Sequence, residues 1–309
     1  MQAVSQQILE IPTEGSLGHL TPKEQGVLTQ FRAHVKDVLK VTDPRFDDWY
    51  LLRFCRARKF DLPKVILMFT NFINWRKEKD IDNGMEKNFT AIYDTAKKEW
   101  EHGYYGVSRD GFPVYIERYA NTDIDYILKT FSEEQLKAYF SNTFETMLHC
   151  IWPECSKAAG RRIDRNITIL DVKGFGVMRM TKSDTRAFLN MATTVAQDFY
   201  PECQGKMFIV NTGWSFSALW AIVKIWLDEK TKKKISVLGS SYMKEITKYV
   251  DASQLPQSLG GDNPNLICDP VGPWKAYMAK CRAEKTLFAD GIVQGDPWKE
   301  DARKANPQE

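Results

Sequence analysis

The stretch YPECQGKMFIVNTGWSFSALWAIVKIWLDEKTKKKISVLG, residues 200–239, places a long apolar run between two short runs typical of β-strands. The strand-like runs are KMFIVNT (206–212) and KISVLG (234–239), which are rich in β-branched or aromatic residues and end at polar or glycine positions. The segment between them is long enough for a helix. A strand, a helix and a second strand in this order predict a crossover connection and two parallel strands in one sheet.

The same alternation extends over most of the chain. Strand-like runs also occur at FPVYIERY (112–119) and NITILDV (166–172), and helical segments are predicted over 132–151 and 181–200. Before residue 100 the pattern is helical: Thr21 is placed as an N-cap before Pro22, and Asp61 as a cap before Pro63. We therefore predict an α/β fold with a helical N-terminal lobe (1–95), a lobe with a mainly parallel sheet (96–272) and a C-terminal extension (273–309).

The composition narrows the classes of function. The chain has 309 residues, 43% of them hydrophobic, which is enough for one large or two modest cores. Its 43 basic and 40 acidic residues nearly balance, so we expect no nucleic-acid partner. The first residues, MQAVSQQILEIPTEG, lack the charged-then-apolar pattern of a secretory signal. We expect a cytosolic or peripherally membrane-bound protein.

Motifs for metal binding and catalysis are missing or incomplete. The six cysteines are scattered without a C-x-x-C pair, which predicts buried free thiols and no metal site. LGSSY (238–242) lacks the second glycine of a nucleophile elbow, and KGFGVM (173–178) lacks the third glycine of a dinucleotide fingerprint. Asp171 ends a strand-like run, where a capping or turn role is the commoner one. We therefore expect no enzyme, no catalytic residue and no cofactor.

The apolar run from Phe216 to Leu227 is too short to span a bilayer, which requires about 20 apolar residues. It is apolar on both faces at helical spacing, so the helix is predicted either to be buried or to lie against lipid. A cluster of lysines, KTKKK (230–234), follows it directly.

A set of motifs in fixed order resembles a known family. They are LLRFCRARKFDLPKV (51–65), DGFPVYIERY (110–119), NITILDVKG (166–174), YPECQGKMFIVNTGWSFSALW (200–220), KISVLGSS (234–241) and LPQSLGGDN (255–263). Together with GSLGHLTPKEQ near the N-terminus, they are similar to the yeast-type phosphatidylinositol/phosphatidylcholine transfer proteins of the CRAL-TRIO superfamily. The resemblance implies a sheet that floors an apolar pocket, closed by a gating helix that includes Phe216, Leu219, Trp220, Val223, Trp226 and Leu227.

The resemblance also implies where two head groups bind. For phosphatidylinositol the matching positions are Arg58, Lys59, Glu202, Thr231 and Lys234. For phosphatidylcholine they are Tyr105, Tyr115, Glu117, Asn166 and Thr168, in which aromatic faces suit a quaternary ammonium. Two departures from the family pattern weaken or alter these expectations: Cys203 follows Glu202 where the family commonly has Arg, and Asn166 stands where it usually has Ser.

The expected function is transfer of one phospholipid at a time, without a covalent step, in support of phosphoinositide metabolism and membrane traffic. The expected partners are the phospholipid and a transient membrane surface at Golgi or endosomes, with the protein acting as a monomer. Lys230, Lys232 and Lys233 either meet an anionic membrane or form a plain solvated surface. Two alternatives stay open: a carrier of a sterol, tocopherol or squalene-like molecule, or a regulatory module with a vestigial pocket.

Overall fold

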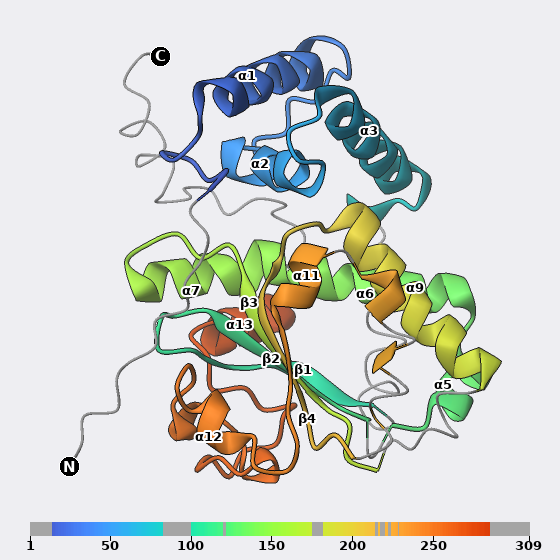
Figure 1. Cartoon of the computed structure of the whole chain (residues 1–309), viewed down its shortest axis with the longest axis vertical. Coiled ribbons are helices and arrows are strands. Elements are labelled where there is room, and N and C mark those ends of the chain that lie inside the picture. The colour runs from blue at the N-terminus through green and yellow to red at the C-terminus, as the bar shows by residue number, and fades with distance from the viewer. Residues whose placement is uncertain are drawn as a thin grey trace.

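The computed structural model describes residues 14–82, 100–119, 122–174, 182–213, 216, 220–221, 224–227 and 229–284. Its N-terminal lobe contains helices α1 (Pro22–Asp37), α2 (Asp48–Ala57) and α3 (Leu62–Glu78), grouped above the rest of the chain in Figure 1. Thr21 caps α1 in a capping box with Glu24, and the Asp61 side chain caps α3, so both predicted helix starts are confirmed.

The second lobe is built on a five-stranded sheet in sequential order, β1-β2-β3-β4-β5. The strands are β1 (Glu101–Val107), β2 (Pro113–Arg118), β3 (Asn166–Asp171), β4 (Gln204–Val210) and β5 (Ile235–Val237). Strands β2 to β5 are parallel, as predicted, while β1 pairs with β2 in the antiparallel direction.

Strand β1 was not predicted from the sequence. Its run EHGYYGV contains two glycines, which have low β-propensity, and shows no clear alternation of polar and apolar residues. Gly106 has a packing reason: a Cβ atom there would lie 2.4 Å from the Gln254 carbonyl oxygen. The glycine therefore lets the segment around Gln254 pack directly on the edge strand.

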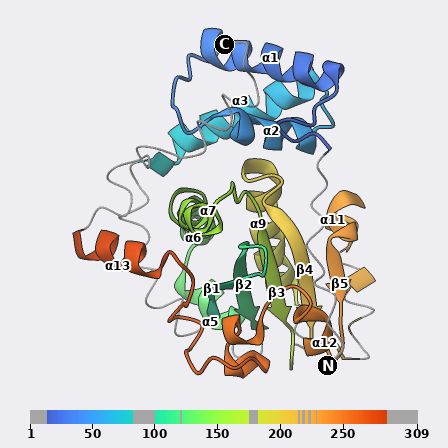
Figure 2. The ribbon, with the colours of Figure 1, turned by 90° about the vertical axis from the view of Figure 1, so that its left-hand side faces the viewer.

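Helices cover one face of this sheet. They are α5 (Ile124–Thr130), α6 (Glu133–Thr146), α7 (Trp152–Ala159) and α9 (Ser183–Phe199), and a π-helical turn, η2 (Met147–Ile151), joins α6 to α7. Figure 2 shows α6 and α7 between the N-terminal helices and the sheet. The opposite face carries α12 (Met243–Ile246) and the 3₁₀ turns η4 (Ala252–Gln254) and η5 (Gln257–Leu259). The chain then continues into α13 (Lys275–Glu284).

Each lobe has its own hydrophobic core, and three partly buried residues, Trp75, Leu148 and Phe199, pack against both cores. The rings of Trp75 and Phe199 stack at 4.0 Å with an interplanar angle of 8°. Arg76 of α3 forms a buried ion pair with Glu145 of α6. The two lobes are therefore joined by packed aromatic rings and a buried ion pair.

The predicted apolar run is described only in part. Phe216 and Trp220 are helical, Lys224–Trp226 forms the 3₁₀ turn η3, and Glu229–Lys233 forms helix α11. Leu219, Val223 and the side chain of Trp226 lie outside the described residues. None of the described helices is long and apolar enough to cross a bilayer.

The cysteines follow the expectation with one exception. Cys55, Cys150, Cys155 and Cys203 are buried free thiols, as expected. Cys268 is exposed, which corrects the expectation for that residue. The side chain of Cys281 lies outside the described part of the chain.

Candidate functional site

A cavity of about 640 Å³ lies between the sheet and helices α6 and α9 and extends to the end of α2 and to α11. Its volume falls within the range of roughly 300 to 1,000 Å³ that is typical of small-molecule sites.

The floor of the cavity is one face of the sheet. Tyr104, Tyr115, Thr168 and Met207 occupy one row across four strands, because Tyr104 pairs with Tyr115, Tyr115 with Thr168, and Thr168 with Met207. Side chains alternate between the two faces of a strand, so residues two positions away also face the cavity. Glu117, Asn166 and Leu170 line it for this reason.

The roof of the cavity is mostly apolar. Helix α6 contributes Phe140 and Phe144, and helix α9 contributes Phe188, Ala192 and Ala196. The alanines leave space between the helix and the sheet, and the phenylalanines surround that space with hydrocarbon. Such walls suit an apolar ligand, because each buried methylene contributes about 0.8 kcal/mol.

One end of the cavity is charged. Arg58, Lys59, Glu202, Thr231 and Lys234 all line it, so the structure brings together every residue predicted for the phosphatidylinositol head group. The Glu202 carboxylate lies 3.5 Å from the Lys234 ammonium and 3.9 Å from Arg56 Nε. Lys59 and Glu202 both adopt positive φ angles, 51° and 58°. Backbone strain of this kind costs on the order of 1 kcal/mol and is common where a site requires a fixed geometry.

Arg56 is a residue of this end that the sequence analysis missed. Its guanidinium is 5% exposed, and only Nη1 donates a hydrogen bond, to the Gly15 carbonyl oxygen at 3.2 Å. Nε and Nη2 have no hydrogen-bond partner among the described residues. Burial and the nearby Arg165 lower the pKa of Arg56, since both disfavour its charge. Its place in RARKF, two residues before Arg58, was the available signal.

The inner part of the cavity holds a buried carboxyl group. Trp100 Nε1 donates a 2.9 Å hydrogen bond to Glu117, which is 7% exposed. Burial raises the pKa of Glu117 to about 7, against the opposing effect of its hydrogen bonds from Tyr119 and Trp100. Near neutral pH this carboxyl group is therefore poised between its protonated and ionised forms.

Asn166 and Thr168 form a small polar network beside Glu117. Asn166 Nδ2 donates to Thr168 Oγ1 at 3.1 Å, and Thr168 Oγ1 donates to Gln204 Oε1 at 2.8 Å. Gln204 also lines the cavity and was not predicted. The Asn166 side-chain carbonyl oxygen is buried without a hydrogen-bond partner among the described residues, so the network still offers an acceptor.

The structure corrects one predicted position. Tyr105 is fully buried, donates to the Asn265 carbonyl oxygen at 3.1 Å and does not line the cavity. Its neighbour Tyr104 lines the cavity instead. The reason is the alternation of the strand: a shift of one residue moves a side chain to the opposite face.

The loop around Glu202 is supported by another residue, although Cys203 stands where the family commonly has arginine. Arg53 Nε donates to the Pro201 carbonyl oxygen at 3.0 Å, and its Nη2 lies 3.2 Å from Cys203 Sγ. Burial raises the pKa of the Cys203 thiol to about 11, so this cysteine is a neutral packing residue. An arginine of α2 thus supports the turn from the side of the N-terminal lobe.

The predicted gating helix reaches the cavity through Leu227, which lines it beside Glu229 of α11. Phe216 is buried, and Trp220 packs against the core of the α/β lobe. Across the described part of the chain, no cluster of three or more histidine, cysteine, aspartate or glutamate residues could hold a metal ion.

Comparison with known proteins identifies the lobes. The family model for the CRAL/TRIO domain matches residues 97–261, and that for the CRAL/TRIO N-terminal domain matches residues 27–71. The chain is 35% identical over 266 residues to the Sec14 cytosolic factor of Schizosaccharomyces pombe, covering 84% of this chain and 91% of that protein. It is 39% identical over 238 residues to the phosphatidylinositol/phosphatidylcholine transfer protein SFH4 of Arabidopsis thaliana, covering 75% of this chain.

This chain spans about two fifths of the plant protein, 39% of its length. Among solved structures, the crystal structure of Sfh5 superposes with a TM-score of 0.59 at 17% identity, covering 86% of this chain and 98% of that one. That likeness concerns the fold alone, and it agrees with a helical lobe followed by a mainly parallel sheet.

Proposed function

Because the chain belongs to the CRAL/TRIO family, we propose that it is a phospholipid carrier that binds one phosphatidylinositol or one phosphatidylcholine at a time and exchanges them at membranes. The observation that carries the proposal is the division of one cavity into an apolar interior and a charged end. The two acyl chains of a phospholipid require the apolar interior, and its phosphorylated head group requires the charged end. Relatives named for transfer of these two lipids support the assignment.

At the charged end we assign the phosphatidylinositol head group. Arg58 and Lys59 supply cations for the phosphate oxygens, and Glu202 accepts hydrogen bonds from inositol hydroxyls. Lys234, 3.5 Å from Glu202, holds that carboxylate in place and adds a positive charge. Thr231 lines the same end and offers a hydroxyl group.

In the interior we assign the phosphatidylcholine head group. Tyr104, which replaces Tyr105 in this proposal, and Tyr115 offer aromatic faces to the quaternary ammonium, an attraction of about 0.5 to 2 kcal/mol. A cation at this place favours the ionised form of Glu117, so lipid binding lowers the pKa of that carboxyl group. Asn166 and Thr168 are the polar partners for the phosphate.

The exchange cycle requires a movable cover. We assign this role to the segment from Phe216 to Leu227, which covers acyl chains when closed and meets the bilayer surface when open. Lys233 is exposed on α11 and offers a cation to anionic lipids, at about 1 kcal/mol. Lys232 is paired with Glu229 at 2.6 Å, so its contribution is reduced. The side chain of Lys230 lies outside the described residues.

The protein is on this view a monomeric carrier rather than an enzyme, acting between the cytosol and the surface of Golgi or endosomal membranes in support of phosphoinositide metabolism. A sterol or tocopherol carrier is the less favoured candidate, because such ligands have no phosphate to occupy the charged end. Lipids extracted from the purified chain and identified by mass spectrometry test the choice. Recovery of a sterol or tocopherol without phospholipid would refute phospholipid transport.

Transfer of labelled lipids between vesicles tests the head-group assignment. The double variant Glu202→Ala, Lys234→Ala is expected to lose phosphatidylinositol transfer and to keep phosphatidylcholine transfer, because both residues lie at the charged end. The matched control Glu154→Ala, Lys157→Ala removes an ion pair on α7 whose residues do not line the cavity, and it should leave both activities unchanged. Equal phosphatidylinositol transfer by the wild type and the Glu202 and Lys234 variant would contradict the assignment.

A further inference from the structure

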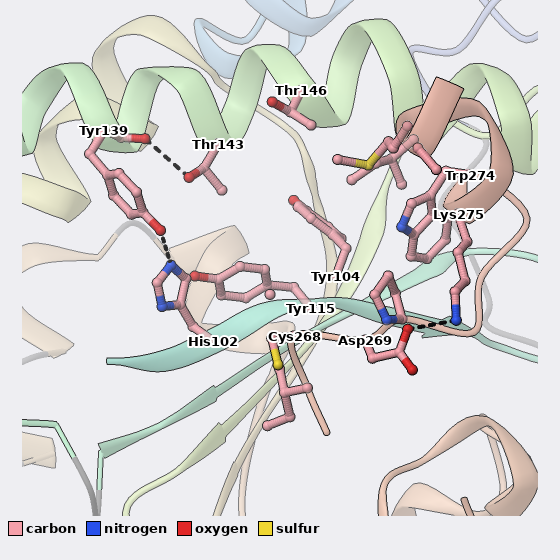
Figure 3. Close-up of a pocket in the computed structure, with 16 residues that line it drawn as sticks. His102, Tyr104, Tyr115, Tyr139, Thr143, Thr146, Cys268, Asp269, Trp274 and Lys275 are labelled. Carbon is pink, nitrogen blue, oxygen red and sulfur yellow. Dashed lines mark hydrogen bonds and ion pairs between the residues drawn. The ribbon is translucent and has the colours of Figure 1, made fainter. Parts of the chain in front are cut away.

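A second cavity lies behind the first. It measures about 220 Å³ and is bounded by β1, β2, α6 and the C-terminal segment from Ile267 to Ala279. Tyr104, Tyr115, Tyr139 and Thr143 line both cavities, so these four side chains form the wall between them. Figure 3 shows Tyr104 and Tyr115 between the strands and the helix that carries Thr143 and Thr146, with Trp274 on the far side.

The walls of this rear cavity are aromatic. The Tyr104 ring meets Tyr115 edge to face at 5.1 Å and approaches Trp274 at 6.4 Å. Among the described residues that line it, the charged side chains are Lys275 and Asp269, which are paired at 2.6 Å and are each about half exposed. A charged ligand would enter the interior without a counter-ion, at a large cost of desolvation. The cavity therefore favours an uncharged, flat ligand.

One hydroxyl group at this cavity, Thr146 Oγ1, is buried without a hydrogen-bond partner in the part of the chain that the structure describes. By contrast, both nitrogens of His102 are occupied: Nδ1 lies 2.8 Å from the Trp100 carbonyl oxygen, and Nε2 lies 2.5 Å from Tyr139 Oη. Buried hydroxyl groups usually have partners, so the unpartnered Thr146 hydroxyl beside a cavity indicates a ligand with its own hydroxyl group.

The π-helical turn shapes one wall. In an α-helix the five steps from Thr146 to Ile151 would make about 1.4 turns and place the two side chains on different faces. The π turn is wider, with the Trp152 N–H donating to the Met147 carbonyl oxygen five positions earlier, so the rotation between the two side chains is smaller. Both residues consequently line the rear cavity. Such turns are frequent at functional sites.

We propose that the rear cavity is a second binding site, next to the proposed phospholipid site and sharing the wall of Tyr104 and Tyr115 with it, for a compact, uncharged aromatic alcohol of the size of a substituted phenol. An apolar cavity of about 150 Å³ in another protein holds benzene, so 220 Å³ accommodates one ring with a short substituent. The ring packs against the aromatic wall that includes Trp274, and its hydroxyl group bonds the unpartnered Thr146 hydroxyl.

Titration calorimetry of the full chain with p-cresol tests this site. Met278 lines the rear cavity and not the larger one, so Met278→Trp fills only the proposed site, and Met278→Leu is its matched control. We expect saturable 1:1 binding by the wild type and by Met278→Leu, and a loss of about tenfold or more in Met278→Trp. Ala279→Trp, at an exposed lining position of α13, serves the same purpose should Met278→Trp fail to fold.

Two further probes define the chemical class. Toluene has the ring of p-cresol without its hydroxyl group and is expected to bind roughly tenfold more weakly. The 4-hydroxybenzoate anion is expected not to bind. If both Met278→Trp and Ala279→Trp bind p-cresol as tightly as the wild type, the probe binds in the larger cavity and the proposal is overturned. Equal affinity for toluene would overturn the alcohol class. No readout here depends on phospholipid transfer, so failure of this site and failure of the proposed transport function are separate results.

Discussion

Replacement of Glu117 by glutamine should make the lipid-free protein more stable at alkaline pH and leave it little changed at acid pH. Burial raises the pKa of this carboxyl group from 4.5 to about 7 in the folded state. An acid with a raised folded-state pKa binds a proton that the unfolded chain releases, so stability falls as the pH rises from 4.5 through 7. The amide of the Glu117→Gln variant keeps the shape of the neutral carboxyl group and cannot ionise.

The pKa difference of about 2.5 corresponds to about 3 kcal/mol at 1.36 kcal/mol per unit, an order-of-magnitude value. Urea unfolding at pH 5 and pH 8 gives the free energies of unfolding of the variant and the wild type. The stability difference between Glu117→Gln and the wild type should increase by about 2.5 kcal/mol between these two pH values, because a small part of the effect is already present at pH 5. All other titrating groups are shared, so their contributions cancel. Glu133→Gln, at an exposed position on α6, should show the same small difference at both pH values.

The same experiment reports on the proposed ligand. When phosphatidylcholine is bound, its ammonium group favours the ionised carboxylate, so the pH-dependent difference between Glu117→Gln and the wild type should shrink. A difference that does not change between pH 5 and pH 8 in the lipid-free protein would refute the reasoning, because it would mean that Glu117 is ionised in the folded state throughout this range.

Three further predictions each compare two lipids or two neighbouring or similar residues. Arg56→Gln should lower phosphatidylinositol transfer by roughly tenfold and spare phosphatidylcholine transfer, because its buried guanidinium lies at the charged end; equal losses for both lipids would indicate a structural role. Tyr104→Leu should weaken phosphatidylcholine transfer in the vesicle assay, because it removes the aromatic face proposed for the quaternary ammonium, whereas Tyr105→Phe should not, since Tyr105 does not line the cavity; a loss with Tyr105→Phe and none with Tyr104→Leu would contradict the assignment. Thr146→Val should be neutral or stabilise by about 1 kcal/mol in urea unfolding, while Thr168→Val should destabilise by a similar amount, because only the Thr168 hydroxyl is hydrogen-bonded; equal effects would contradict this.

The parts of the fold that follow local rules were predictable. The parallel strands are short β-branched or aromatic runs, and the N-terminal helices begin at caps such as Thr21 and Asp61. Strand β1 was missed because its glycines serve a packing contact with Gln254, a residue about 150 positions away. The register of β1 with β2 also shifts between Tyr104 and Val107, so sequence alternation alone could not tell which tyrosine faces inward.

The candidate site was predictable where the motif match fixed positions. Arg58, Lys59, Glu202, Thr231 and Lys234 come from separate segments, and the structure places them around one cavity. Arg56 and Gln204 were missed because an arginine or glutamine in a sequence is exposed by default, and only tertiary packing reveals that it is buried. The rear cavity was equally out of reach, since it depends on α13 closing over β1 and α6.

The charged end of the cavity belongs to neither lobe alone. Arg56, Arg58 and Lys59 come from the helical lobe, and Glu202 and Lys234 come from the α/β lobe. The ion pair of Glu202 with Arg56 joins the two lobes, and its ion pair with Lys234 lies within the α/β lobe. The hydrocarbon walls, by contrast, are supplied by the sheet with α6 and α9. Under the proposed function, holding the acyl chains depends on the α/β lobe, whereas holding the phosphatidylinositol head group depends on both lobes. A change in how the lobes meet would then alter binding of that head group without altering how much hydrocarbon is held.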